Sequence, residues 1–304
     1  MSYHIAILDA DVPQAAAYQS RGFYSSQFRT LLQAAAGRLS SKDREISIFT
    51  SSYDLTGGSY PPLESLRTTK REPVYCKEHS SPNPLAWPID GILITGGAPG
   101  AYETDKYPWI KTLQSFIETV YREYPYVKFF GSCFGHQILA QALLSESAPQ
   151  CPAYEVGICP RGFEVGVVPI TLSPEFVSSF PSLMEKIPGP QKQLRLQMIH
   201  GDWVIPANEP ATPHAQLPPG WVNVGWTEMC PFQGFYQPSR VLTYQGHFEF
   251  DRFVNHELCL AFSKRLGFPK DLLDQYLVAI ERGVEGDDSK VAAEAVVMFF
   301  CGLS

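Results

Sequence analysis

The sequence predicts a doubly wound, mostly parallel α/β sheet with helices on both of its faces. Short apolar runs recur along the first half of the chain, and several of them end in acidic or glycine residues, as buried parallel strands often do. Segments with apolar residues at helical spacing lie between these runs. This alternation favours crossover connections and therefore a parallel sheet.

The first half of the chain supplies most elements of this sheet. The first apolar run ends at Asp9-Ala10-Asp11, and a later one breaks at Gly96-Gly97. We expect strands at residues 3–8, 45–49, 89–95 and 126–130. We expect helices at residues 19–36, with Gly37 as a stop signal, at 109–121 and at 134–144.

The second half combines short strands with helices and gives no sign of an internal repeat. We expect strands at residues 164–171, 196–200, 221–226 and 241–244, and helices at 250–266, 271–280 and 290–300. Residues 54–88 are rich in Gly, Pro, Ser and Thr and predict a long loop, which we expect to cover a functional site. Residues 1–250 predict one domain, and residues 251–304 predict a C-terminal helical extension packed on the same domain.

Composition and charge exclude several classes of protein. The 304 residues are 44% hydrophobic and 18% charged, as in globular chains that bury a sizeable core. The formal net charge is −7 and no Lys/Arg block occurs, so we expect no nucleic-acid partner. No apolar run approaches the roughly 20 residues of a membrane span. The first residues do not match a signal peptide, so we expect neither a membrane nor a secretory route.

The cysteines favour a reducing, cytoplasmic setting. Their number is odd, their spacing is scattered and no C-x-x-C motif occurs, which argues against a disulfide framework and a metal site. They are Cys76, Cys133, Cys151, Cys159, Cys230, Cys259 and Cys301. One of them can be a nucleophile while the others pack.

The strongest local signal surrounds Cys133. An apolar strand runs directly into Gly131-Ser132-Cys133-Phe134-Gly135, and a helical segment follows. This is the nucleophile-elbow pattern with Cys in place of Ser. Flanking glycines avoid Cβ clashes in the sharp turn, and the helix N-terminus favours a thiolate. The N–H of Phe134 is then placed to bind an oxyanion. A buried cysteine in an ordinary tight turn is the alternative.

A cysteine nucleophile needs a base, and two histidines are candidates. His136 follows Cys133 on the same helix, where packing or hydrogen bonding is the favoured role. His247 follows an apolar strand, and Glu249 lies two residues later, on the same side of an extended backbone. Glu249 can therefore orient the imidazole while the other ring nitrogen serves the thiol.

The Gly96-Gly97 break supplies a third element. A strand that ends in two glycines can expose backbone N–H groups, and Gly97 is a candidate second oxyanion donor. An ordinary glycine turn is the alternative. A dinucleotide-binding loop is excluded because no G-x-G-x-x-G motif occurs.

These three motifs, in this order, resemble the class I glutamine amidotransferase family. The matching segments are residues 96–97, 131–137 and 246–249, and weaker similarity covers most of the chain. The resemblance is greatest to stand-alone members similar to GMP-synthase-like proteins and γ-glutamyl peptidases. It implies a flavodoxin-like fold, a triad of Cys133, His247 and Glu249, and an oxyanion hole from Gly97 and Phe134. It also implies that Gln137 lines the glutamyl pocket.

The chain departs from the family pattern in three places. Phe248 stands where the family usually has Pro between the His and the Glu, although the spacing is kept. Residues 143–147 replace a glycine pair that follows the cysteine helix, so we expect an altered substrate pocket. Ser132 takes the place of Ile or Val, and we expect no effect on the site.

The resemblance implies hydrolysis of a γ-glutamyl amide, in glutamine or in a γ-glutamyl peptide, through a γ-glutamyl thioester. No cofactor and no metal are expected, and the chain carries no phosphate-binding loop for ATP chemistry. A glutaminase subunit that passes ammonia to a separate synthetase chain is the alternative. A non-catalytic relative is less favoured because Cys133, His247 and Glu249 are all present. Other cysteine proteins of similar fold are also possible, but they would not require the segment of His247 and Glu249, so its presence counts against them.

Overall fold

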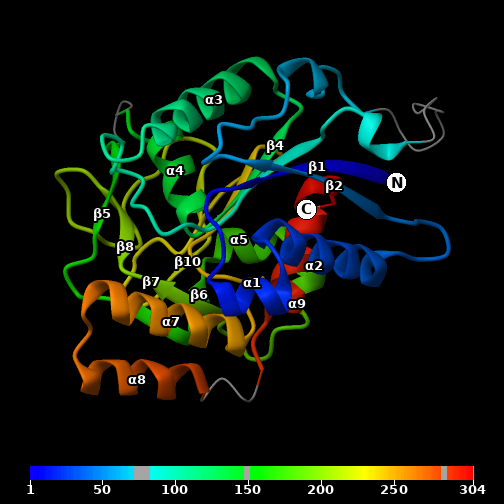
Figure 1. Ribbon diagram of the computed structural model, residues 1–304. Helices are drawn as coiled ribbons and strands as arrows, with labels where there is room; N and C mark the ends of the chain where they lie inside the picture. Colours follow the sequence, from blue (N-terminus) through cyan, green and yellow to red (C-terminus); the bar gives the residue numbers. More distant parts are fainter. Residues whose placement is uncertain (72–82, 147–150, 282–285, 304) are drawn as a thin grey trace.

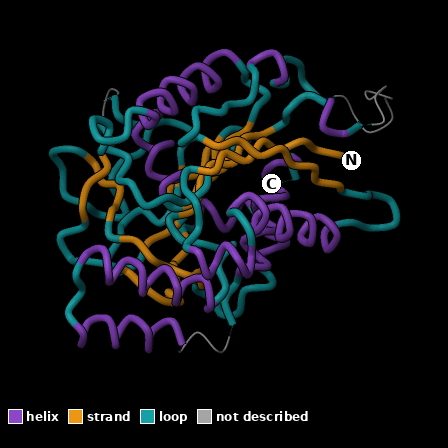
Figure 2. The backbone as a smooth tube through the Cα atoms, viewed as in Figure 1, coloured by secondary structure: helices purple, strands orange, loops and turns teal. Residues whose placement is uncertain are grey.

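A seven-stranded sheet in the order β2-β1-β3-β4-β12-β11-β9 forms the centre of the computed structural model, which describes residues 1–71, 83–146, 151–281 and 286–303. The first five strands are parallel, and β11 and β9 add antiparallel to the β12 edge. Figure 2 shows these strands crossing the middle of the molecule. The strands are β1 Ser2–Asp9, β2 Ser47–Asp54, β3 Gly91–Ile94, β4 Lys128–Ser132, β9 Val222–Asn223, β11 Phe235–Gln237 and β12 Val241–Tyr244. The predicted doubly wound class is confirmed.

Helices cover both faces of this sheet (Figure 1). α3 (Trp109–Glu123) and α4 (Phe134–Leu143) pack on one face, where their apolar side chains share a core with Ile92, Ile94 and Phe129. α2 (Tyr24–Leu39) and α9 (Ser289–Cys301) pack on the other face, against Ile5, Ile7, Leu93 and Phe130. Neighbouring strand residues point to opposite faces, which is why the two cores contain alternate residues of the same strands.

The last helix, α9, is part of the central core. Ten of its 13 residues are buried, and it lies along α2. The Tyr3 hydroxyl donates a hydrogen bond to the Cys301 carbonyl at 3.0 Å, and Lys128 Nζ donates to the Phe299 carbonyl at 2.6 Å. Both bonds join α9 to strands of the sheet.

Two smaller antiparallel sheets flank the central one. One pairs β5 (Tyr154–Ile158) with β8 (Asp202–Pro206), and the other has the order β10-β6-β7. The remaining strands are β6 Glu164–Leu172, β7 Gln193–His200 and β10 Gly225–Trp226. The remaining helices are α1 Ala15–Arg21, α5 Pro174–Ser179, α6 Pro181–Met184, α7 Arg252–Leu266 and α8 Lys270–Glu281, with short 3₁₀ turns at Leu63–Ser65 and Pro84–Ala86. α7 and α8 pack against β7 and β6, respectively.

Three expectations about single elements were wrong. The helix expected at residues 19–36 is two helices, because Gly22 takes a φ of 74° between α1 and α2. Gly37 does not end α2, which continues to Leu39. The strand expected at 221–226 divides into β9 and β10, which pair in different sheets. β5, β8 and β11 were not predicted, since they are short or lie between proline-rich segments.

The long segment at residues 54–88 does not reach the Cys133 turn in its described part, contrary to expectation. Arg67 Nε and Arg71 Nη1 both contact the Asp90 carboxylate, at 2.6 and 2.7 Å. Asp90 immediately precedes β3, whereas Cys133 follows the opposite, carboxyl end of β4. Residues 72–82, which include Cys76, lie outside the described part. No helix among the described residues is long and apolar enough to cross a membrane.

Candidate active site

The turn between β4 and α4 places Cys133 in an unusual backbone conformation. Cys133 has a φ of 49° and a ψ of −103°, a region that side-chain-bearing residues seldom occupy. A Cβ on Gly131 would lie 2.4 Å from the Gly135 carbonyl oxygen. A Cβ on Gly135 would lie 2.3 Å from the Ile94 carbonyl oxygen. The turn therefore requires glycine on both sides, as the motif predicts.

The two candidate oxyanion donors lie on segments next to Cys133 in the fold. Phe134 is the first residue of α4, so its N–H has no acceptor within the helix. The helix N-terminus also brings positive partial charge to this point. Gly97, which follows β3, lines the cavities on both sides of Cys133. The oxyanion roles of Gly97 and Phe134 stay predictions, and Gly97 shares both cavities with Cys133.

His247 and Glu249 follow β12, the strand next to β4. His247 Nδ1 lies 2.6 Å from Glu249 Oε1, and both side chains are buried. The His247 N–H donates to the Gln197 carbonyl of β7 at 2.8 Å, which fixes the backbone here. The Phe250 ring stacks on the imidazole with 3.9 Å between ring centres and a 10° interplanar angle. One ring nitrogen is thereby committed to the carboxylate, and the structure brings His247 and Cys133 to the same cavity.

The surroundings of His247 change its protonation. Burial alone lowers the pKa of the imidazole, but the charge of Glu249, the charge of Cys133 and hydrogen bonds to both outweigh that effect. Together they raise the pKa of His247 from 6.5 to about 10. The imidazolium is therefore the favoured form at neutral pH.

This shift has a consequence for stability. The pKa of His247 is higher in the folded protein than the value of 6.5 in the unfolded chain. The protonated imidazole therefore adds to the free energy of unfolding. This contribution is fully present below about pH 6.5 and is lost as the pH rises through about 10. We expect the urea midpoint of the native protein to fall between pH 7 and pH 10 by more than that of a His247→Gln variant. Urea unfolding of both proteins at each pH measures this difference. If the urea midpoints of the two proteins changed with pH in parallel, the raised pKa of His247 would be contradicted.

A chain of side-chain amides also ends on the sulfur. Gln137 Nε2 donates to Gln245 Oε1 at 3.1 Å, and Gln245 Nε2 lies 3.4 Å from Cys133 Sγ as a donor. Both glutamines are buried. Gln137 therefore borders the site, as expected from its motif, but it reaches the thiol through Gln245.

His136, the second candidate base, points away from the thiol. Its Nδ1 lies 2.8 Å from Thr243 Oγ1, and its ring stacks on Phe235 at 5.2 Å. Burial lowers the pKa of His136 to about 3, so the ring is neutral. This position agrees with the role in packing or hydrogen bonding that the sequence favoured for His136.

The chain is similar to known proteins over most of its length. The chain is 29% identical over 300 residues to a protein of Schizosaccharomyces pombe provisionally named glutamine amidotransferase-like, an alignment that spans 98% of this chain and 99% of the relative. It is 38% identical over 164 residues to a Saccharomyces cerevisiae protein provisionally named a glutamine amidotransferase, over 53% of each chain. By their names both relatives are glutamine amidotransferases or similar to them, and the chain resembles that family. No protein-family model matches it.

The fold is also found in solved structures of glutamine amidotransferases. A glutamine amidotransferase from Thermotoga maritima matches with a TM-score of 0.58 and 18% identity over 98% of each chain. A glutamine amidotransferase from Methylobacillus flagellatus matches with a TM-score of 0.57 and 18% identity, over 99% of this chain and 94% of the other.

Two departures from the family pattern have clear positions in the structure. Phe248 points away from its neighbours His247 and Glu249 into the core, where its ring lies 5.3 Å from Phe28. No role was expected for Ser132, and the structure places it beside Glu249. Its Oγ donates to Glu249 Oε1 at 3.1 Å, so it helps to hold the carboxylate that orients the imidazole.

The third departure does not border the described cavities at Cys133. Leu143 ends α4, and Leu144 is buried in a cluster with Tyr154 and Phe232. Neither residue lines the cavities that contain Cys133. Ser147 lies outside the described part of the chain. The altered pocket expected from this segment is therefore not found in residues 143–146.

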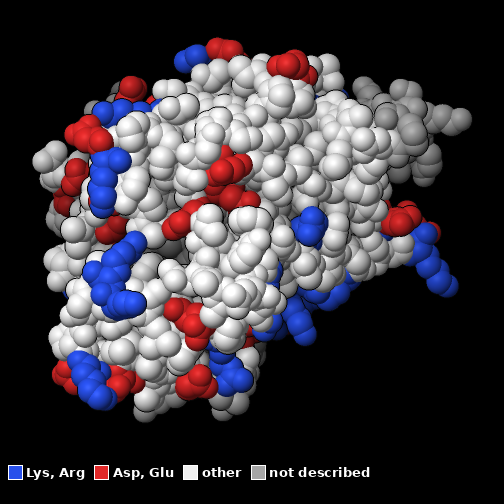
Figure 3. All heavy atoms as spheres, viewed as in Figure 1, with Lys and Arg blue, Asp and Glu red and all other residues white. Residues whose placement is uncertain are grey.

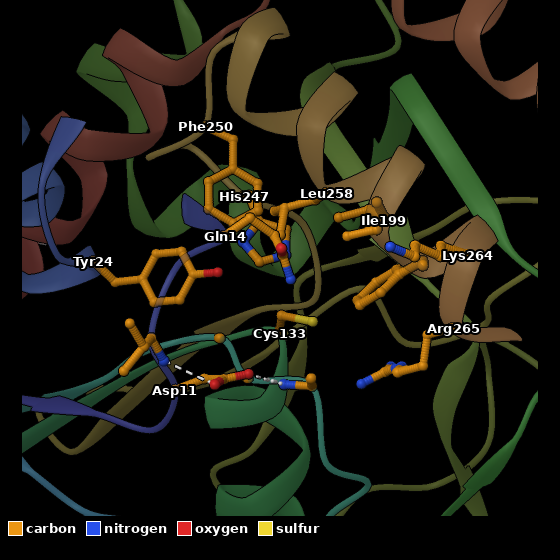
Figure 4. A pocket seen from close by; sticks show the side chains of 16 residues that line it. Asp11, Gln14, Tyr24, Cys133, Ile199, His247, Phe250, Leu258, Lys264 and Arg265 are labelled. Atoms are coloured by element: carbon orange, nitrogen blue, oxygen red, sulfur yellow. Dashed lines mark hydrogen bonds between the residues drawn. The ribbon is translucent and has the colours of Figure 1, made fainter. Parts of the chain in front are cut away.

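Two cavities meet at Cys133. One, of about 470 Å³, contains His247, Tyr24, Phe250 and Lys264 (Figure 4). The other, of about 430 Å³, contains Gln137 and polar residues of the 100–107 and 200–202 segments. No cluster of three or more metal-ligating side chains occurs among the described residues.

Proposed function

We propose that the protein is a cysteine hydrolase that cleaves γ-glutamyl amide bonds, in glutamine or in γ-glutamyl peptides, through a γ-glutamyl thioester on Cys133. The observation that carries this proposal is the buried His247–Glu249 pair, 2.6 Å apart, which shares a cavity with Cys133 at the strained turn before α4. A nucleophile beside an oriented base is the arrangement that acyl transfer requires.

In the acylation step the Cys133 sulfur, after giving its proton to His247, attacks the amide carbon and forms a C–S bond. The carbonyl oxygen becomes an oxyanion, and the N–H groups of Gly97 and Phe134 stabilise it. The His247 imidazolium then protonates the leaving nitrogen as the C–N bond breaks. The raised pKa of His247 supports this role, because the proton is held until the amine departs.

In the deacylation step neutral His247 takes a proton from water, and the hydroxide attacks the thioester carbon. The C–S bond breaks, glutamate leaves and the thiolate–imidazolium pair is restored. Glu249 stabilises the imidazolium throughout, and Ser132 holds Glu249 in position.

The experiment is to incubate the purified chain with glutamine and with γ-glutamyl peptides, to measure released glutamate, and to trap the acyl enzyme by acid quench. We expect peptide mapping to place a γ-glutamyl adduct on the Cys133 peptide and not on the peptides of Cys151 or Cys259. An adduct on another cysteine, or glutamate release without any adduct, would contradict the mechanism. Release that requires an added synthetase chain would instead favour the glutaminase-subunit alternative.

A further inference from the structure

The cavity that contains His247 carries features that cleavage of glutamine does not use. It lies beside α7, and its lining combines apolar side chains with Tyr24, Asp11 and Lys264. Figure 4 shows Tyr24 on one side of this space, Lys264 and Arg265 on the other, and Cys133 and His247 between them. We call it the amine-side cavity.

The position of His247 decides which half of the substrate enters the amine-side cavity. A general acid must reach the nitrogen that it protonates, so the leaving amine lies on the side of His247. His247 lines this cavity and not the neighbouring one, which contains Gln137. The acyl half of the substrate then occupies the Gln137 side, and the leaving half occupies the amine side. This assignment rests on the proposed function.

The size of the amine-side cavity exceeds what ammonia needs. Its volume is about 470 Å³, whereas a molecule the size of water or ammonia takes up about 30 Å³. Phe250, Leu258 and Phe262 supply apolar walls. A leaving group of several heavy atoms fits this space.

Tyr24 offers a hydrogen bond to such a group. It is only 6% exposed, it lines the cavity, and its hydroxyl has no hydrogen-bond partner among the described residues. Burial, and the nearby charges of Asp11, Glu249 and Cys133, raise the pKa of Tyr24, so the hydroxyl remains a donor. The hydroxyl faces the cavity, so a ligand there can accept a hydrogen bond from it.

The charges around the cavity match an amino acid. Lys264 lines this cavity alone and Arg265 lines both cavities; both side chains are exposed, and neither forms an ion pair with a described residue. The Asp11 carboxylate, held by the N–H groups of Val12 and Ala98 at 2.8 and 2.9 Å, faces the same space. Figure 3 shows basic and acidic side chains on opposite sides of a hollow on this face. Ammonia presents no group for a cation, but the carboxylate of a leaving amino acid does.

We propose that the amine-side cavity is a binding site for a leaving group that is itself an amino acid or short peptide with a free carboxylate. Lys264 and Arg265 bind the carboxylate, Tyr24 donates a hydrogen bond to the leaving group, and Asp11 attracts the ammonium that forms on protonation. The preferred substrate class is then a γ-glutamyl peptide and not glutamine.

The experiment compares kcat/KM for glutamine, a γ-glutamyl dipeptide and the C-terminal amide of the same dipeptide. We expect the native protein to favour the free-acid dipeptide over both others by about tenfold or more, the effect of one charge-assisted contact. Tyr24→Phe is expected to lower kcat/KM for the dipeptide about tenfold. Lys264→Ala is expected to reduce the preference for the free acid over its amide.

Matched controls separate binding from general damage. Tyr18→Phe removes a hydroxyl from an exposed tyrosine of α1, and Arg252→Ala removes a charge from the other end of α7, in an exposed ion pair with Glu281. Both controls should match the native protein. Three outcomes would overturn this inference alone. They are equal turnover of the free-acid dipeptide and its amide, a preference for glutamine, and Tyr24→Phe and Lys264→Ala variants that behave like their controls. No glutamate from any substrate would overturn the proposed function and this inference with it.

Discussion

Replacement of Cys133 by Ala is expected to abolish glutamate release and acyl-enzyme formation while leaving the fold intact. The sulfur forms the only covalent bond to the substrate in the proposed mechanism, and loss of a nucleophile lowers kcat by roughly 10⁴–10⁶-fold in comparable hydrolases. Alanine keeps the Cβ of cysteine, so the backbone strain at φ 49° is unchanged and thermal unfolding should shift little. Steady-state assays with a γ-glutamyl substrate measure the effect.

Cys259→Ala is the control for this experiment. Cys259 is fully buried in α7, where burial raises its pKa to about 11 and keeps the thiol neutral. Its loss should change stability by a packing effect of roughly 1–3 kcal/mol and leave the thioester chemistry in place. Full activity in Cys133→Ala, or equal losses in the two variants, would contradict the assignment of the nucleophile.

Replacement of Gly135 by Ala is expected to cause the largest loss of stability of any single methyl group added to the site. The new Cβ would lie 2.3 Å from the Ile94 carbonyl oxygen, closer than any real contact. Relief requires α4 to move away from β3, which separates the turn from Gly97, the candidate donor that follows β3. We expect a destabilisation of about 4 kcal/mol or more, a large part of the ~5–15 kcal/mol that stabilises a typical domain.

Gly37→Ala is the opposite case and serves as the control. Gly37 lies inside α2, and nothing lies within 4 Å of a Cβ built there. Alanine is the better helix former by about 0.5–1 kcal/mol, so this variant should be slightly more stable than the native protein. Urea unfolding of both variants gives the comparison. Similar midpoints for the two would show that the turn before α4 tolerates a side chain.

The motifs around Cys133 and His247 could be read from the sequence because each one lies in a short segment. A strand, a cysteine between glycines and a helix occupy adjacent residues, and His247 and Glu249 are two residues apart. Strand alternation then decides which side chains face each other. The same reasoning predicted β12 with its observed bounds.

The residues that the sequence did not reveal reach the site from distant segments. Tyr24 is the first residue of α2, and nothing in its local sequence links it to Cys133, more than 100 residues later. The helix was expected to run from 19 to 36, so Tyr24 was expected inside a helix and not at its start. Gln245 and Phe250 lie beside the His247 motif, but their contacts depend on side-chain direction. Ser132 was visible as a departure from the family pattern, and its polar side chain next to the nucleophile was the available signal.

The burial of α9 has a consequence for synthesis of the chain. The Tyr3 hydroxyl and the Cys301 carbonyl that it bonds are 298 residues apart. At roughly 5–20 residues per second, a ribosome needs about 15–60 s to supply that partner. During this interval one apolar face of β1, β3 and β4 has no helix α9 to cover it. From the synthesis of β4 until that of α9, this apolar face therefore lacks one of its two covering helices, and the yield in cells should depend on chaperones that shield such surfaces.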